Sequence, residues 1–426
     1  MMRSWLAPSI AVAFALATAV APRGRAAALP ACDPGNGGIT LPDGFCAAIA
    51  ADNLGSVRHL AVAPNGDLFA ALKGGSQGTG VVALRDSDGD GRLEVKERFG
   101  TDGGTGIAVR NGYLYFATPT SVLRFKLASG GLKPVGAADV IVGGLPEQRQ
   151  HEDKGVAFDG KGGMYLNIGA PSNACQSPDR RLKVPGQDPC PLLEKHAGIW
   201  RFDENKPGQK ADDGKRYATG MRQMIALTWH SGALYAAMHG RDQLSALWPE
   251  LFTVEQSAEL PSETLQRVEP GSNFGWPYCY HDWRQNTLVL APEYGGDGKK
   301  TTRCEAFTAP LVGFPGHWAP NDLLFYTAPQ FPKKYQGGAF IAFHGSWNRA
   351  PLPQGGYNVA FVPFSGAKPS GKYEVFADGF AGKVPLMRPN DAMARPEGLA
   401  VAPDGSLYIA EGQKGRIWRV MYRGGK

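Results

Sequence analysis

Two short apolar runs separated by a tight turn recur at least five times along the chain. Each copy reads as an apolar stretch, a turn centred on glycine and a second apolar stretch, which is the pattern of a β-hairpin. Asn-Gly and Asp-Gly in several of these turns supply the positive φ angles that tight hairpins require. The copies occupy residues 58–70, 106–116, 155–166, 225–235 and 398–409.

The spacing of these hairpins predicts a ring-shaped all-β fold. Four of the turn glycines, Gly66, Gly112, Gly162 and Gly232, lie roughly 45 to 70 residues apart. A unit that recurs at such a period is typical of a β-propeller, in which four-stranded antiparallel blades surround a central channel. We also expect a strand near residues 46–51 to close the ring beside a strand near 415–422, because closure removes exposed sheet edges.

The composition agrees with a single turn-rich β domain behind an export signal. Gly 57 and Pro 33 in 426 residues are typical of a chain with many turns. Arg3 is followed by an apolar stretch and then by small residues up to Ala28, which is the pattern of a signal peptide. We therefore expect a signal peptide over 1–28 and one propeller domain over 29–426, in the periplasm or secreted.

Membrane anchoring and nucleic-acid binding are both disfavoured. After the signal, no apolar run reaches the roughly 18 residues that a membrane-spanning helix needs. Arg23 and Arg25 separate the apolar stretch from Cys32, which argues against a lipid anchor at that cysteine. The formal charge of +6 is mild, and the chain has no basic run of the kind that nucleic-acid binding uses.

The six cysteines predict three disulfides. An even number of cysteines in an exported chain favours disulfide bonds, and no Cys-x-x-Cys motif suggests a metal or redox site. Pairing of near neighbours closes three short loops, through Cys32–Cys46, Cys175–Cys190 and Cys279–Cys304.

Cationic residues recur where the innermost strands of the predicted blades begin. Alignment of the repeats on their turns places His151, Arg222 and Arg395 at the same position, and Arg58 is displaced by two residues. A sheltered group of arginines favours a small polyanion, because a guanidinium can bind a carboxylate or phosphate with two hydrogen bonds. Neighbouring positive charge lowers the pKa of a histidine and keeps it neutral, so His151 is a candidate general base.

Two further motifs follow apolar strands. The segment His344–Arg349 offers the flat ring of Trp347 to a planar ligand, and its last residue adds another cation. In the segment 238–242, Gly240 leaves room for the backbone carbonyls to face a ligand. Each segment could equally form a purely structural corner.

A complete match to a twelve-residue calcium loop lies between two of the predicted strands. Asp86, Asp88 and Asp90 occupy its first, third and fifth positions, Gly91 its sixth and Glu97 its last. The flanking helices of an EF-hand are not evident. The loop therefore predicts either a structural calcium site or an acidic turn.

Together these residues resemble the glucose/sorbosone dehydrogenase family of soluble quinoprotein sugar dehydrogenases, with the closest likeness to the L-sorbosone dehydrogenase type. The resemblance extends from about Cys46 to Arg423. Its most specific points are residues 218–222, 239–242, 275–278, 342–349 and 395–400. It implies a six-bladed propeller that binds pyrroloquinoline quinone (PQQ) and Ca²⁺ over the channel mouth and oxidises a sugar aldehyde or hemiacetal.

The resemblance also implies roles for individual residues. His151 matches the family's catalytic base, and Arg222 matches an arginine near the quinone oxygens that takes part in catalysis. Gly240 and Arg241 match positions whose backbone carbonyls hold the cofactor calcium. The family commonly has Arg-Asn where this chain has Arg222-Gln223. The residues expected to contact the cofactor are Arg58, Arg222, Gln223, Trp347, Asn348, Arg349 and Arg395.

Two alternatives stay open beside a PQQ-dependent sugar dehydrogenase. A calcium-dependent sugar lactonase would hold its metal in the channel with acidic and amide side chains, whereas the repeat positions here carry Arg and His. A non-enzymatic propeller would bind a partner through its faces and would not need a cationic mouth. For the dehydrogenase we expect a small sugar or aldehyde substrate and an electron acceptor that the sequence does not identify.

Overall fold

The chain folds into a six-bladed β-propeller, as the repeat pattern predicts. The computed structural model describes residues 1–2, 29–74 and 79–424. The predicted signal peptide falls almost entirely on residues 3–28, outside the described residues. The innermost strands of successive blades contact one another around the central axis. These innermost strands are β2, β6, β10, β15, β21 and β27.

Each blade is a four-stranded antiparallel sheet. Blade 1 contains β2 (Val57–Val62), β3 (Leu68–Leu72), β4 (Val81–Arg85) and β5 (Val95–Phe99). Blade 2 contains β6 (Ile107–Arg110), β7 (Tyr113–Ala117), β8 (Ser121–Lys126) and β9 (Asp139–Gly143), with β13 (Gln209–Lys210) added in parallel to β9. Blade 3 contains β10 (Val156–Phe158), β11 (Gly163–Ile168), β12 (Gly198–Asp203) and β14 (Lys215–Thr219).

The remaining blades follow the same order. Blade 4 contains β15 (Ala226–His230), β16 (Ala233–Met238), β17 (Glu263–Val268) and β20 (Val312–Phe314). Blade 5 contains β21 (Pro320–Phe325), β22 (Ala339–Phe343), β23 (Asn358–Val362) and β26 (Glu374–Ala377). Blade 6 contains β27 (Pro396–Val401), β28 (Leu407–Glu411), β29 (Ile417–Tyr422) and β1 (Phe45–Ala51).

The two ends of the chain share blade 6. Strand β1 pairs antiparallel with β29, from Phe45 opposite Tyr422 to Ala51 opposite Ile417. The predicted closure of the ring is therefore confirmed. It ties down both termini and leaves no gap between the first and last blades.

The core lies between neighbouring blades. Every residue of β3 and β22 is buried, because adjacent blades cover both faces of these strands. This explains why their sequences are continuous apolar runs, whereas a half-exposed strand would alternate with period two. One interblade cluster joins aromatic residues of blades 5 and 6, including Phe340, Phe361, Phe376 and Trp418.

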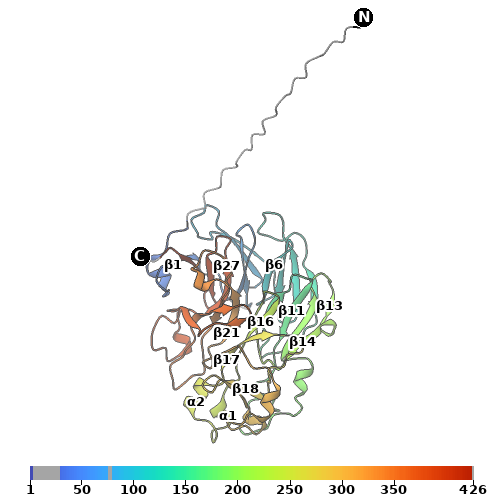
Figure 1. Cartoon of the computed structure of the whole chain (residues 1–426), viewed down its shortest axis with the longest axis vertical. Coiled ribbons are helices and arrows are strands. Elements are labelled where there is room, and N and C mark those ends of the chain that lie inside the picture. The colour runs from blue at the N-terminus through green and yellow to red at the C-terminus, as the bar shows by residue number, and fades with distance from the viewer. Residues whose placement is uncertain (3–28, 75–78, 425–426) are drawn as a thin grey trace.

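Three long connections form a lobe at one end of the molecule, where Figure 1 shows α1, α2 and β18 together. They join β11 to β12, β16 to β17, and β17 to β20. The loop that follows β11 contacts the other two connections, since the Lys183 N–H donates to the Leu247 carbonyl and the Gly186 N–H to the Glu293 carbonyl. Cys175, Cys190, Cys279 and Cys304 share one buried cluster there. The lobe contains α1 (Leu244–Leu247), α2 (Val254–Glu259), β18 (Cys279–Asp282) and β19 (Thr287–Leu290).

The other small elements lie in the loops between strands and before β1. A two-stranded ribbon pairs β24 (Phe364–Ser365) with β25 (Lys368–Pro369). Short 3₁₀ turns cover Pro34–Gly38, Pro191–Glu194, Ala211–Asp213, Pro292–Tyr294, Thr302–Ala306, Lys333–Tyr335 and Pro389–Asp391. None of the helices in the described part of the chain is long and apolar enough to span a bilayer.

All three predicted disulfides form. The Cα atoms of Cys32 and Cys46 are 5.9 Å apart, those of Cys175 and Cys190 are 6.1 Å apart, and those of Cys279 and Cys304 are 5.8 Å apart. Two of the bonds close loops of the lobe, and the third anchors the N-terminal segment to β1. The lobe is thereby cross-linked within two of its own connections.

Candidate functional site

A cavity of about 270 Å³ opens where the lobe meets the channel. It lies beside the start of β10 and β15, beyond the end of β16, and next to the connection after β22. In a propeller these loops lie on the same face, because first strands begin there and second strands end there. The cavity is lined by Gln150, His151, Arg180, Arg222, His239, Gly240, Asp242, Glu263, His317, Ala319, Trp347 and Asn348.

His151 is held as a neutral base in this cavity. Its Nδ1 lies 2.5 Å from the carbonyl oxygen of Ala170, so Nδ1 carries the ring proton and Nε2 keeps its lone pair. Burial, and then the charge of Arg222, lower the pKa of His151 from 6.5 to about 3. The imidazole is therefore unprotonated at neutral pH and can accept a proton through Nε2.

Arg222 lies beside His151 with one donor group unused. Its Nη2 donates to Asp242 Oδ2 at 2.7 Å, and its Nη1 donates to the Gly240 carbonyl at 2.7 Å. Its Nε is buried and has no hydrogen-bond partner among the residues that the structure describes. A buried N–H without a partner is costly, which favours a ligand acceptor at this position.

Asp242 connects the loops around the cavity. Arg180 Nη2 donates to its Oδ2 at 3.0 Å, and Asn348 Nδ2 donates to its Oδ1 at 2.8 Å. His317 Nδ1 lies 3.6 Å from Oδ1. Burial raises the pKa of Asp242, but Arg222, His317 and Arg180 outweigh it and hold the pKa well below its ordinary value. Asp242 therefore stays ionised and joins residues from four other segments.

Gly240 allows a close approach between two backbone segments. A Cβ at this position would lie 2.8 Å from the Ser262 carbonyl oxygen. The Gly240 N–H donates to Glu263 Oε2 at 3.0 Å, and burial raises the pKa of Glu263 to about 7. The carbonyl of Gly240 and the carboxyl of Glu263 thus place oxygen ligands at the cavity wall, where a hard cation could bind.

The structure brings together five of the residues predicted from the sequence. His151, Arg222, Gly240, Trp347 and Asn348 all line the cavity. Trp347 is 58% exposed at its rim, and the Oδ1 of Asn348 is buried without a partner among the described residues. An aromatic face and an unpaired guanidinium N–H fit a planar ligand that carries carboxylate groups, whereas the unpaired amide oxygen would need a donor group on that ligand.

The other predicted cofactor residues lie behind the cavity and bond to the protein itself. Arg58 is buried between Glu397, at 2.5 Å, and Asp153, at 2.6 Å. Arg395 donates to the carbonyls of His344, Gly345 and Ser346 at 3.0 to 3.2 Å. The mouth is therefore less cationic than the sequence indicates at Arg58, whose charge Glu397 and Asp153 neutralise. Arg395 donates to neutral carbonyls and keeps its charge.

The three remaining predicted residues are also engaged by the protein. Arg349 Nη1 donates to the carbonyls of Ala258 and Gly316, and its Nη2 pairs with Glu259. Arg241 Nη1 pairs with Glu293 at 2.5 Å. Gln223 accepts from Asn167 Nδ2 at 3.1 Å and donates to the Asp153 carbonyl. Direct roles of these side chains and of the Arg241 carbonyl toward a cofactor stay predictions.

Seven residues of the cavity were not predicted from the sequence, and five of them have ionisable side chains. His239 and Asp242 lay within the quoted segment 238–242, whose residue types could have indicated them. Arg180 is delivered by the loop that Cys175–Cys190 closes, and no local pattern marks it. Glu263 and His317 also lack a motif, because only the folded ring brings them to this wall.

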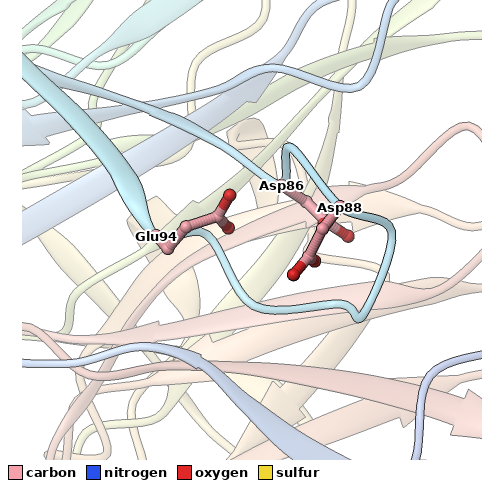
Figure 2. A group of neighbouring side chains, drawn as sticks. All are labelled: Asp86, Asp88 and Glu94. Atoms are coloured by element: carbon pink, nitrogen blue, oxygen red, sulfur yellow. The ribbon is translucent and has the colours of Figure 1, made fainter.

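The acidic loop lies at the opposite end of the strands, beside the β2–β3 turn. Figure 2 shows Asp86 and Asp88 with Glu94, and carboxylate oxygens of these three residues lie within 4.8 Å of one another. Asp90 accepts from the backbone of Arg92. Glu97, the predicted last ligand, lies on β5 and pairs with Lys133 at 2.8 Å. Calcium binding by this loop stays a prediction, with Glu94 now in the place expected for Glu97.

Comparison with known proteins gives matches along most of the chain. A family model described as TrAA12-like matches residues 39–423. An uncharacterized protein of Borreliella burgdorferi is 28% identical over 279 residues, which are 64% of this chain and 61% of that protein. A pyrroloquinoline quinone-dependent pyranose dehydrogenase of Coprinopsis cinerea is 27% identical over 193 residues, which are 37% of this chain and 24% of that enzyme. The matched regions thus span less than two thirds of either relative.

Solved structures share the fold. The calcium structure of a Trichoderma reesei family AA12 enzyme aligns with a TM-score of 0.73 at 18% identity, over 90% of this chain and 97% of that one. The holo PQQ domain of pyranose dehydrogenase from Coprinopsis cinerea gives 0.71 at 17% identity, over 93% and 98%. The apo form of an aldose sugar dehydrogenase from Escherichia coli gives 0.58 at 16% identity, over 89% and 100%.

Proposed function

Because the chain belongs to the TrAA12-like family, we propose that it is a PQQ- and Ca²⁺-dependent dehydrogenase of a sugar aldehyde or hemiacetal. The product is the corresponding acid or lactone, and the substrate is of the sorbosone or aldose type. One observation carries the proposal: a half-buried neutral histidine with a fixed tautomer lies in a cavity beside an arginine whose Nε is unpaired.

The residues at the cavity fit the proposed cofactor. Arg222 Nε would donate to an oxygen of the quinone, and the face of Trp347 would cover a flat ring. The Gly240 carbonyl and the Glu263 carboxyl would supply oxygen ligands to the cation. We propose that Arg58, Arg349 and Arg395 act mainly through the loops they hold, since the protein already binds their guanidinium groups.

When bound, PQQ supplies an acceptor for the hydride that leaves the substrate carbon. His151 Nε2 would accept the hydroxyl proton of a hemiacetal, or of the hydrate that water forms with a free aldehyde, and its Nδ1–H keeps the Ala170 carbonyl as partner. Asp242 holds Arg222 in place by the contact at 2.7 Å. The substrate carbon thus loses one hydride, which carries two electrons, and the hydroxyl proton passes to the imidazole.

A lactonase is disfavoured because the carboxylate of Asp242 at the cavity is already hydrogen-bonded to other side chains. Asp242 is occupied by Arg222, Arg180 and Asn348, so its oxygens are not free for a channel metal. Within residues 29–74 and 79–424, the three acidic side chains that come close enough to hold an ion together are Asp86, Asp88 and Glu94, away from the cavity. A sugar-binding propeller without catalysis would not need a neutral base beside Arg222.

We also propose that residues 1–28 are removed on export and that residues 29–426 act as one domain. The three disulfides support an oxidising compartment, in which such bonds form and persist.

Reconstitution tests the function directly. Purified protein with its disulfides intact is titrated with PQQ and Ca²⁺, and sugar oxidation is followed with a dye acceptor across aldoses and sorbosone. We expect saturable PQQ binding, sugar-dependent reduction, and a loss of turnover of about two to four orders of magnitude in His151→Ala with PQQ affinity retained.

His230→Ala is the matched control, because this histidine lies at the far end of β15 and stacks on Phe325. It should keep both PQQ binding and turnover. Failure of the wild-type protein to bind PQQ would overturn the proposed function, and near-normal turnover in His151→Ala would overturn the assignment of the base.

A further inference from the structure

His151 adopts a backbone conformation that it would not hold by itself. Its φ angle is +57°, in the left-handed region that side chains other than glycine rarely adopt. Such a residue persists only where its surroundings over-determine it. Gly169 lies against it, since a Cβ on Gly169 would lie 2.6 Å from the His151 Cβ and 2.7 Å from the His151 carbonyl oxygen. The turn that carries the base is therefore held by specific contacts.

The side chain of Gln148 makes the central contact with this turn. Its Nε2 lies 2.7 Å from the Gln150 carbonyl oxygen, 2.9 Å from that of His151 and 3.1 Å from that of Gly169. An amide has two N–H groups, so three carbonyls share them. The Gln148 Oε1 is buried and has no partner among the described residues. The Nε2 end of the amide therefore faces the three carbonyl oxygens, because a flipped amide would place its own oxygen against them.

These carbonyls belong to the two backbone segments that position the imidazole of His151. One lies on His151 itself, and another lies on Gly169, directly before Ala170, whose carbonyl receives the Nδ1 proton. A single side chain therefore connects the backbone of the base to the segment that fixes its tautomer. Lys154, which is fully buried, donates to the Glu152 carbonyl on the other side of the turn.

We propose that Gln148 is a positioning residue for His151, holding the left-handed turn so that Nδ1 stays protonated and Nε2 faces the cavity as the base. The proposal rests on the proposed function for the role of His151 as base. Gln148 does not line the cavity. Its loss should therefore change the geometry and tautomer of the imidazole while leaving the contacts to cofactor and sugar in place.

The test compares Gln148→Ala and Gln148→Glu with the wild-type protein. The glutamate keeps the shape of the side chain, but its carboxylate cannot donate a hydrogen bond. If the alanine variant folds poorly, Gln148→Glu therefore still measures the effect of losing the Gln148 N–H donors. We expect both variants to lose about 10- to 100-fold in kcat, the effect of a displaced catalytic group, with KM and PQQ affinity unchanged within about twofold.

Nitrogen NMR of the apo-protein provides a readout that does not depend on turnover. The chain has eight histidines, and His151→Ala identifies the His151 signals. In the wild-type protein we expect one tautomer, with Nδ1 protonated. In Gln148→Ala and Gln148→Glu we expect a mixture of tautomers or exchange broadening.

Gln209 provides a matched control elsewhere in the chain. Its Nε2 also faces three carbonyl oxygens, those of Ile141, Asp203 and Lys206, at 3.4, 2.8 and 2.8 Å. Gln209→Ala should lower the melting temperature about as much as Gln148→Ala, with normal kcat and an unchanged His151 tautomer.

The possible outcomes distinguish the role of Gln148 from the proposed function. Equal kcat in Gln148→Ala and Gln209→Ala, or a His151 tautomer that is unchanged in both Gln148 variants, would overturn the positioning role. If the wild-type protein bound no PQQ, the proposed function would fail, and the tautomer in the apo-protein would still test Gln148.

Discussion

Removal of the charge on Glu397 should destabilise the ring more than removal of any surface carboxylate. Glu397 is 1% exposed, and its Oε1 lies 2.5 Å from Arg58 Nη1 and 3.0 Å from His344 Nε2. Its Oε2 accepts from Asn321 Nδ2 at 2.7 Å. Burial raises the pKa of Glu397, but Arg58 and His344 outweigh it and lower the pKa from 4.5 to about 2.

The size of the effect follows from this pKa. A carboxyl whose pKa falls from 4.5 to about 2 on folding stabilises the folded state by about 3 kcal/mol at neutral pH. Loss of one partner of a buried ion pair costs about 3–5 kcal/mol in general, because the other charge stays buried. In Glu397→Gln, Arg58 keeps only Asp153 as an anionic partner. We therefore expect a loss of about 3 kcal/mol in the free energy of unfolding.

Urea unfolding of the apo-protein at pH 7, with disulfides intact, measures the loss. Glu374→Gln is the control, since Glu374 pairs with Lys334 at the surface and both side chains are about half exposed. It should cost less than about 1 kcal/mol. A loss below about 1 kcal/mol in Glu397→Gln would show that the charge of Glu397 does not stabilise the ring in this way.

The pH dependence of the same difference is a second check. Because the folded-state pKa of Glu397 is depressed, its contribution is fully present above pH 4.5 and is lost as the pH falls toward about 2. The gap in stability between the wild-type protein and Glu397→Gln should therefore narrow below pH 4.5. A gap that is constant down to pH 3 would contradict the assignment of the charge.

Three further predictions concern the cavity and the acidic loop. Since burial and Arg222 lower the pKa of His151 to about 3, kcat/KM should be flat between pH 5 and 8 as far as this group is concerned; an acid limb near pH 6.5 in the rate profile would contradict this. Arg395→Ala should weaken retention of PQQ in equilibrium dialysis, because Arg395 holds the loop before Trp347, and excess PQQ should restore part of the activity; unchanged retention would show that this loop contact does not support cofactor binding. Added Ca²⁺ should raise the melting temperature of the wild-type protein and of Glu97→Gln, but less in Asp88→Asn, whose carboxylate belongs to the acidic group; equal shifts in all three would remove the loop as a calcium site.

Local sequence patterns were sufficient for the blades and for part of the cavity. Glycines such as Gly66 and Gly112 mark turns that need positive φ, and the apolar runs on either side become paired strands. Because the repeats are equivalent, alignment placed His151 and Arg222 at the same end of neighbouring blades, where the cavity is found. The disulfides followed from the order of the cysteines, since near neighbours close short loops.

The partners of the buried ion pairs could not be predicted from the sequence, because closure of the ring brings them together. Arg58 and Glu397 are 339 residues apart, yet they meet because blades 1 and 6 are adjacent at the axis. Without this contact the sequence indicates a free cation at Arg58, whereas the structure shows a buried pair. The same reason explains Arg395, whose donors are taken by the backbone of a neighbouring blade.

The amino-acid sequence was sufficient for the fold class, the closure of the ring, the disulfides and the position of the candidate base, because hairpin turns, apolar strand runs and repeat equivalence are local or periodic. Which charged side chains stay available to a ligand and which are neutralised by a partner became clear only from the folded ring. Folding also brings Arg180, Asp242, Glu263 and His317 to one wall, from segments that are far apart in the sequence. The physical reason is that burial and pairing of a charge depend on contacts between distant segments, and no local pattern records those contacts.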